Sequence, residues 1–183
     1  KSLASKGIVS VLPIVPFYGK RRPGYQYKHY AKTVADLFMS SYGCFIEGAK
    51  LIEWSRLHFR KAVGISGISW GAMACGEALM SDEDVKIISY FGSSSPVALS
   101  SGLLSLQLSF ERFQEIKKSN KKFVKRKLHN VLEEMSLNTF NDTSWIKNRR
   151  KLDGIIISAK HDHIVFPSEA EALYESILKL NLN

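Results

Sequence analysis

The stretch KAVGISGISWGAMAC, residues 61–75, decides the fold class of this chain. Its first part, residues 62–65, is a short apolar run that predicts a β-strand, and a helix is expected to begin near Trp70. Between them, Gly67-Ile68-Ser69-Trp70-Gly71 has the G-x-S-x-G spacing of a nucleophile elbow, a sharp strand-to-helix turn that exposes a serine. Glycine suits the positions two before and two after this serine, because the backbone comes too close there for side chains. The stretch predicts Ser69 as a nucleophile; the alternative is a buried serine in an ordinary turn.

Apolar runs on both sides of this stretch indicate further strands of a parallel sheet. Strands are predicted over residues 7–15, 62–65, 85–91 and 152–159, and helices over 29–40, 45–59, 121–135 and from Ser168 onward. The run at 7–15 is rich in β-branched apolar residues and has too few polar breaks for a one-sided strand, so it fits a strand buried on both faces. Gly43 is expected to end the first helix, and Ala49, Ile52, Trp54 and Leu57 to form the buried face of the second. This alternation predicts an α/β fold with a parallel sheet flanked by helices.

No strand is predicted between residues 93 and 151. About sixty residues are too many for a plain crossover between two strands, and a hydrolase would carry a lid-like helical insertion here. The prediction is therefore one α/β domain over residues 1–183, with a helical insertion at 93–151. The chain opens on Lys1 and runs directly into an apolar segment, so we expect an excerpt that lacks the first strands and the last strand of its fold.

Composition limits the classes of function. The 183 residues carry a formal charge of +9, but no nucleic-acid-binding motif accompanies it, so nucleic acid is not an expected partner. Cys44 and Cys75 have no metal-binding or redox spacing, and no cofactor or metal is predicted. No apolar run is long enough for a membrane span.

A serine nucleophile needs a base that takes its proton and a carboxylate that orients the base. Asp162 fits the carboxylate by position, because it follows the predicted strand at 152–159 and lies downstream of Ser69. The alternative is that Asp162 only caps the turn before Pro167. Ser168 and Glu171 then have the spacing of a capping box for the last helix.

Four groups of residues, in order along the chain, carry a resemblance to a known family. They are Pro16-Phe17-Tyr18-Gly19 with Arg21-Arg22-Pro23, residues 64–71, Phe91 with residues 93–95 and 100–104, and Ala159-Lys160-His161-Asp162 with Val165-Phe166-Pro167. In these residues the chain resembles the α/β-hydrolase domain-containing protein 18 family. The resemblance implies an α/β-hydrolase fold, a Ser-Asp-His triad and an acyl-lipid substrate such as a phospholipid, and it is compatible with a mitochondrial association.

Two departures from that family bear on the chemistry. Trp70 and Ala72 stand where the family usually has Met and Gly, which changes the shape of the site more than the mechanism. The family's histidine lies in a Gly-Gly-His segment that would follow Asn183. Five histidines are present, namely His29 and His58 on predicted helices, His129 in the insertion, and His161 and His163 beside Asp162. None is well placed to serve Ser69, so the base is expected outside these residues.

Backbone N–H groups are expected to stabilise the oxyanion: one from Trp70, directly after the nucleophile, and one from Tyr18, with Phe17 as the next choice. The acid-free run between Lys117 and Lys127 is either a solvated helix face or a contact with an anionic membrane. The function predicted is a serine hydrolase of carboxylic esters, acyl lipids among them. The alternative is a binding or scaffold protein that keeps the hydrolase fold without turnover.

Overall fold

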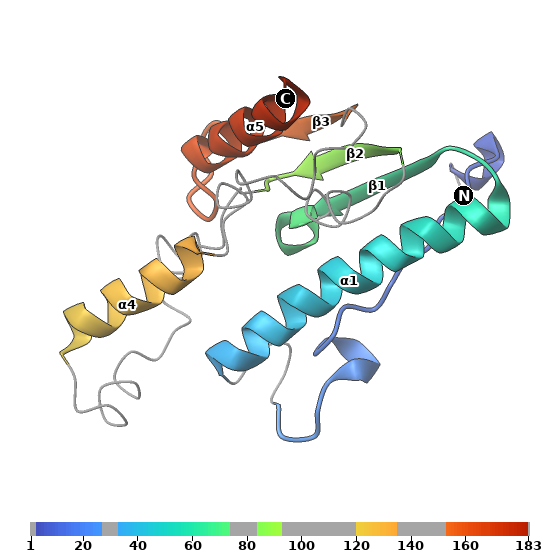
Figure 1. The fold of residues 1–183 in the computed structure, drawn as a ribbon. Helices are drawn as coiled ribbons and strands as arrows, with labels where there is room; N and C mark the ends of the chain where they lie inside the picture. Colours follow the sequence, from blue (N-terminus) through green and yellow to red (C-terminus); the bar gives the residue numbers. More distant parts are fainter. Residues whose placement is uncertain (1–2, 27–32, 74–83, 93–119, 135–152, 183) are drawn as a thin grey trace.

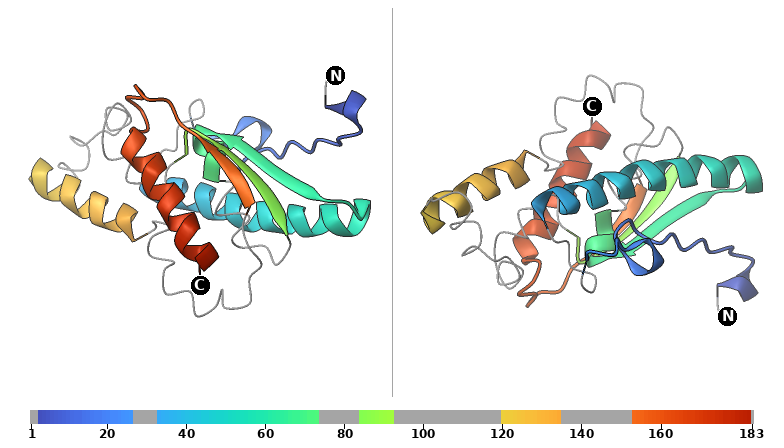
Figure 2. Two further views of the ribbon diagram at one scale, coloured as in Figure 1. Left: turned by 90° about the horizontal axis from the view of Figure 1, so that it is seen from above. Right: turned by 90° about the horizontal axis from the view of Figure 1, so that it is seen from below.

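The computed structural model describes residues 3–26, 33–73, 84–92, 120–134 and 153–182 (Figure 1). Its elements are the short 3-10 helices η1 (Ala4–Lys6), η2 (Gly19–Arg21) and η3 (Ser69–Met73), the helices α1 (Val34–Phe59), α4 (Lys121–Glu133) and α5 (Pro167–Leu182), and the strands β1 (Val63–Ile68), β2 (Val85–Tyr90) and β3 (Asp153–Ile157). The strands form a parallel sheet in the order β1-β2-β3, which confirms the predicted sheet. In the two views of Figure 2, α1 and α5 cover opposite faces of this sheet.

The central strand β2 supplies the core of the sheet. Val85, Ile87 and Ser89 alternate along it and are buried, and their register partners lie on both neighbouring strands. Leu173 of α5 is fully buried over this layer. At the amino end, Lys86 of β2 pairs with Asp153, its neighbour on β3, in an exposed ion pair of 2.5 Å. Because the three strands are parallel, their carboxyl ends all lie at the same edge of the sheet.

One helix, α1, replaces the two helices predicted over residues 29–40 and 45–59. Thr33 and Asp36 form a capping box at its start, and the helix runs for 26 residues. The prediction that Gly43 ends a helix is wrong. Gly43 lies inside α1, where the Pro16 ring packs on it; a Cβ there would come within 2.9 Å of Pro16 Cγ. Glycine costs helix stability at this position but permits the close approach of the preceding loop.

Two of the four residues predicted to form the buried face of the second helix are buried in α1. Ala49 and Ile52 are buried, together with Ser41 and Cys44, and these residues follow the helical repeat. Trp54 and Leu57 are 47 % and 77 % exposed, so they do not belong to this face. Trp54 instead stacks on His58, one turn further along, at a ring distance of 4.9 Å.

The strand predicted over residues 7–15 is absent from the sheet, which corrects that prediction. The segment is irregular, and five of its large apolar side chains are exposed: Ile8, Val9, Val11, Leu12 and Ile14. Pro13 has no N–H to donate to a ladder. At its end, Arg21 donates to the Ile14 carbonyl at 2.8 Å, which ties the segment to the loop that follows it.

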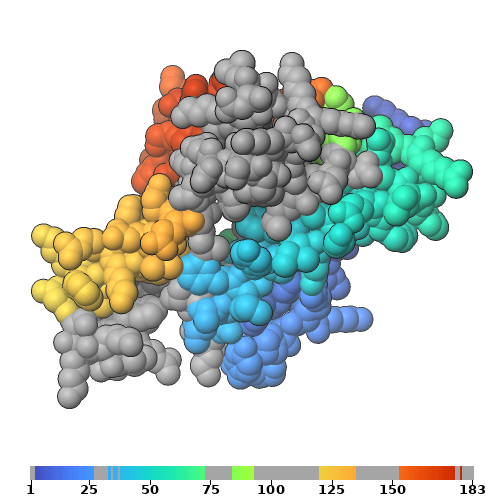
Figure 3. Space-filling view, viewed as in Figure 1, coloured from blue at the N-terminus to red at the C-terminus, as the bar shows by residue number. Residues whose placement is uncertain are grey.

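The predicted helix at 121–135 is confirmed as α4, which occupies a corner of the molecule (Figure 3). The remaining residues of the predicted insertion, including the apolar stretch at 103–116, lie outside the described residues. Among the helices described, none combines the length and the apolar character that crossing a bilayer requires.

Candidate active site

The turn after β1 has the backbone of a nucleophile elbow. The strand extends to Ile68, three residues further than predicted, and Ser69 follows it at once with a φ of 53°. A non-glycine residue in this left-handed region is strained by roughly 1–2 kcal/mol. Ser69 is exposed, and it begins η3. The turn therefore lifts the serine out of the sheet edge, as the G-x-S-x-G spacing predicts.

The two glycines that frame Ser69 have different roles. A Cβ added to Gly67 would overlap the carbonyl group of Gly71 and the amide nitrogen of Ala72. A Cβ on Gly71 would meet no described atom within 4 Å. The backbone therefore crosses itself at Gly67, and the predicted steric requirement holds for this glycine. At Gly71 the described neighbours leave room for a side chain.

Gly92, Ser89 and the Trp70 indole pack closely around the elbow, although the sequence pattern did not indicate such a role for them. Gly92, after β2, lies so near the turn that its Cβ would be 2.9 Å from Ala72 Cβ and 3.3 Å from Leu173 Cδ2. Ser89 has a fully buried hydroxyl without a hydrogen-bond partner, and Trp70 has a buried indole N–H in the same condition, as far as the described chain extends. In the sequence, Gly92 is marked only by its place after the apolar run at 85–91. Its close packing against the turn depends on tertiary contacts with Ala72 and Leu173.

Asp162 lies in the loop between β3 and α5. Its Oδ1 accepts hydrogen bonds from the backbone N–H groups of Ile164 at 2.8 Å and Val165 at 3.1 Å. The turn-capping alternative is thus observed, but it uses one carboxylate oxygen only. Among the described residues, no hydrogen-bond donor contacts Oδ2. An anchored carboxylate with one remaining oxygen is suited to orienting a base.

The predicted capping box at Ser168 and Glu171 is wrong. Helix α5 begins one residue earlier, at Pro167, so Ser168 is already inside its first turn. Proline favours the first helical position because its φ is preset and its missing N–H would have had no partner there.

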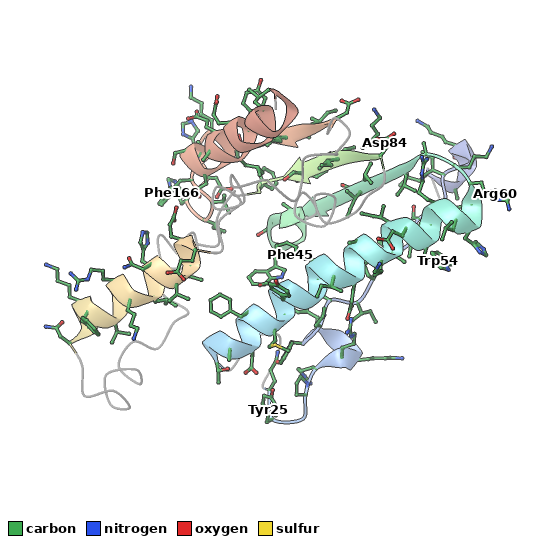
Figure 4. All side chains as sticks on the ribbon, in the orientation of Figure 1. Tyr25, Phe45, Trp54, Arg60, Asp84 and Phe166 are labelled. Carbon is green, nitrogen blue, oxygen red and sulfur yellow. The ribbon has the colours of Figure 1, made fainter. Side chains whose placement is uncertain are left out.

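Topology places Ser69 and Asp162 at the same edge of the sheet. Each follows the carboxyl end of a parallel strand, and β2 separates the two strands. Because neighbouring strands lie about 4.8 Å apart, the carboxyl ends of β1 and β3 are roughly 10 Å apart. Figure 4 marks the two edges: Phe166 lies at the end of the Asp162 loop, and Asp84 lies at the opposite edge, before β2. A span of this size between the two strand ends is wide enough for an imidazole ring.

The backbone N–H of Tyr18 is engaged within its own loop. It donates to the Val15 carbonyl at 3.0 Å and closes a turn in which Phe17 has a φ of 66°. Proline at the second position of a turn and a positive φ at the third, as at Pro16 and Phe17, are the geometry of a type II turn. Tyr18 would have to leave its bond to Val15 before serving as an oxyanion donor.

Polar contacts fasten this loop to α1. Arg21 binds both carboxylate oxygens of Glu47, at 2.5 and 2.7 Å, and Ser40 donates to the Pro16 carbonyl at 2.9 Å. The hydrogen bond from Arg21 lowers the pKa of the Glu47 carboxyl. The same bond raises the pKa of Arg21, which keeps the pair charged.

The described histidines do not complete a triad in an evident way. His58 stacks on Trp54 near the end of α1, and Figure 4 shows Trp54 and Arg60 away from the elbow edge. His161 and His163 are exposed in the loop of Asp162, and His129 lies on α4. His29 is outside the described residues. In the parts of the chain that the structure describes, no group of three His, Cys, Asp or Glu side chains could hold a metal ion.

Comparison with known proteins identifies the family. The model of the family described as alpha/beta hydrolase domain containing 18 matches residues 1–167. No curated protein and no solved structure matches the chain. The match covers most of the 183 residues and agrees with the parallel sheet between helices, which corresponds to part of an α/β-hydrolase fold. The chain belongs to the alpha/beta hydrolase domain containing 18 family.

Proposed function

We propose that this protein is a serine hydrolase of carboxylic esters, with acyl lipids such as phospholipids as its substrate class. The observation that carries the proposal is the strained backbone of Ser69, held by the crossing of Gly67 and Gly71. Membership of a hydrolase family supports a hydrolytic reaction, and the resemblance described above supports the lipid class.

The chemistry follows from the elbow. Ser69 Oγ attacks the ester carbonyl carbon while a base takes its proton, and the carbonyl oxygen gains negative charge. The backbone N–H of Trp70, directly after the nucleophile, stabilises that charge. When the tetrahedral intermediate collapses, the protonated base returns the proton to the leaving alcohol, and water then releases the acyl group by the same steps. Asp162 Oδ2 holds the base in the correct tautomer.

The base is a histidine beyond Asn183 in this proposal. His161 and His163 are neighbours of Asp162 on one short loop, and adjacent side chains are poorly placed for one to orient the other toward a separate strand end. The family resemblance, in which the histidine follows the last helix, supports the same assignment.

Active-site labelling tests the nucleophile. In the full-length protein, a fluorophosphonate should label Ser69, and Ser69→Ala should abolish the label. Ser66→Ala is the matched control, because Ser66 is an exposed serine three residues away within β1. It should leave labelling unchanged. Label on another serine, or label that persists in Ser69→Ala, contradicts the assignment.

The same protein decides between turnover and the scaffold alternative. Ester hydrolysis by the full-length chain should require one histidine beyond residue 183, and it should survive His161→Ala and His163→Ala. If one of those two variants loses activity, the base lies beside Asp162. A folded full-length protein that neither labels nor hydrolyses ester favours the binding role, in which Asp162 serves only as the observed turn cap.

A further inference from the structure

Helix α4 carries many positive charges, and those in its first turn are unfavourable next to the positive end of its own helix dipole. Five of its thirteen residues are Lys or Arg, and its single acid, Glu133, is the last residue. No acidic residue lies in its first turn, where Lys121 and Lys122 meet the positive end of the helix dipole. The Asn120 side chain accepts from the Lys122 N–H and caps the helix, but it adds no charge. A nearby anion would relieve this arrangement.

One face of α4 fastens it to the rest of the chain. Leu132 is almost fully buried, and Val124, Leu128 and Val131 are half-buried at helical spacing on the same side. In Figures 1 and 2 the carboxyl end of α4 is the end nearer the sheet, and its basic amino-terminal half is farther out. The helix is therefore anchored at one end and presents the other.

The opposite face combines basic and aromatic side chains. We call Lys122, Phe123, Arg126 and Lys127 the outer patch of α4; all four are exposed and lie within one and a half helical turns. Phe123 is 48 % exposed although it is a large apolar residue. The Arg126 guanidinium lies 5.9 Å from the centre of its ring. An exposed aromatic ring among cations is the composition of a helix that lies in a membrane interface.

We propose that the outer patch of α4 docks on the surface of an anionic lipid bilayer, with the Phe123 ring entering the interfacial region. The basic side chains meet lipid phosphates and carboxylates, and each contributes about a fivefold increase in binding near such a surface. Phe123 distinguishes lipid from a nucleic acid on this short helix, because the patch offers one ring and no row of aromatic platforms for successive bases. The inference concerns a surface and stands apart from the hydrolase proposal.

Vesicle binding by the full-length protein tests the patch. The probe is vesicles of equal parts phosphatidylserine and phosphatidylcholine, compared with pure phosphatidylcholine, in a sedimentation assay. Together, Lys122→Glu, Arg126→Glu and Lys127→Glu should lower the partition coefficient by about a hundredfold. A matched triple variant at exposed lysines elsewhere, Lys6→Glu, Lys20→Glu and Lys61→Glu, makes the same charge change and should lower it far less.

The aromatic part of the proposal has its own variants. Phe123→Ala should weaken vesicle binding by about tenfold, and Phe123→Trp should restore it, since tryptophan favours the membrane interface. Single charge reversals, each expected to weaken binding by about fivefold, keep the test decisive if the triple variant fails to fold. Ser69→Ala should bind vesicles as the unaltered protein does, which separates docking from catalysis.

Three results would overturn the docking site. The first is equal loss of vesicle binding in the two triple variants, which would make it an effect of net charge. The second is vesicle binding that does not change in Phe123→Ala. The third is tighter binding to single-stranded polyuridine RNA than to the anionic vesicles, if the charge reversals at the outer patch abolish the RNA binding. That result would assign the patch to nucleic acid.

Discussion

The carbonyl group of Gly71 occupies the space in which a side chain on Gly67 would begin. These two residues stand on either side of Ser69, so their contact closes the turn and holds the serine at its positive φ. A hydrogen atom is the only substituent that this crossing tolerates at residue 67. The strained angle at Ser69 thus depends on a backbone contact that Ser69 itself does not make.

Substitution of the two glycines should separate their roles. Gly67→Ala should destabilise the protein by about 3 kcal/mol and abolish fluorophosphonate labelling, because the turn must open to accept the methyl group. Gly71→Ala, the matched control, should change the free energy of unfolding by less than about 1 kcal/mol. Denaturant unfolding of the full-length variants measures both values. Similar losses at the two positions would mean that the turn is held by something other than the contact at Gly67.

The two oxygens of Asp162 allow its structural and catalytic roles to be tested apart. Asp162→Asn keeps an acceptor for the N–H groups of Ile164 and Val165 but removes the charge that would stabilise a protonated base. We expect this variant to unfold like the unaltered protein and to lose about 10⁴-fold in turnover, the loss seen when a triad aspartate becomes asparagine.

Asp162→Ala removes the acceptor as well. It should lose activity to a similar extent and, in addition, lose about 1 kcal/mol of stability, because the two backbone donors then lack a partner. Activity within tenfold of normal in Asp162→Asn would leave Asp162 with the capping role alone, and another carboxylate would have to orient the base.

The ion pair between Arg21 and Glu47 predicts an acid sensitivity of the loop on α1. Arg21 lowers the pKa of Glu47 below its ordinary value of 4.5. The pair's contribution is therefore complete above pH 4.5, and it disappears as the pH falls through the lowered pKa. Both side chains are exposed, 41 % for Arg21 and 46 % for Glu47, so the contribution should stay below about 1 kcal/mol.

Glu47→Gln should remove this part of the acid dependence. The difference in free energy of unfolding between the variant and the unaltered protein should be largest near neutral pH and should decrease as the pH falls below 4.5 and through the lowered pKa of Glu47. Trypsin should also cleave faster after Lys20 and Arg21 in the variant, because the loop has lost its contact with the helix. A difference that is independent of pH would mean that Glu47 acts through packing.

Local sequence signals predicted the elbow, the strands β1, β2 and β3, and the position of Asp162. Each signal spans a short range of the chain: the Gly-x-Ser-x-Gly spacing indicates a tight turn, and an apolar run indicates a buried strand. The run at 7–15 shows that such a segment can also stay outside the sheet. The family resemblance rested on the same segments, and the family match over residues 1–167 confirms it.

Steric demands within a few residues place the nucleophile turn and the strands β1, β2 and β3 along the sequence, because they leave few local alternatives. Tertiary contacts decided the rest. Residues 7–15 stay outside the sheet, and the loop that follows them is fastened to α1 by Arg21 and Glu47. Gly43 lies within a helix and leaves the space that Pro16, 27 residues earlier, occupies. Such choices compare the energies of contacts between distant residues, and no local pattern contains that comparison.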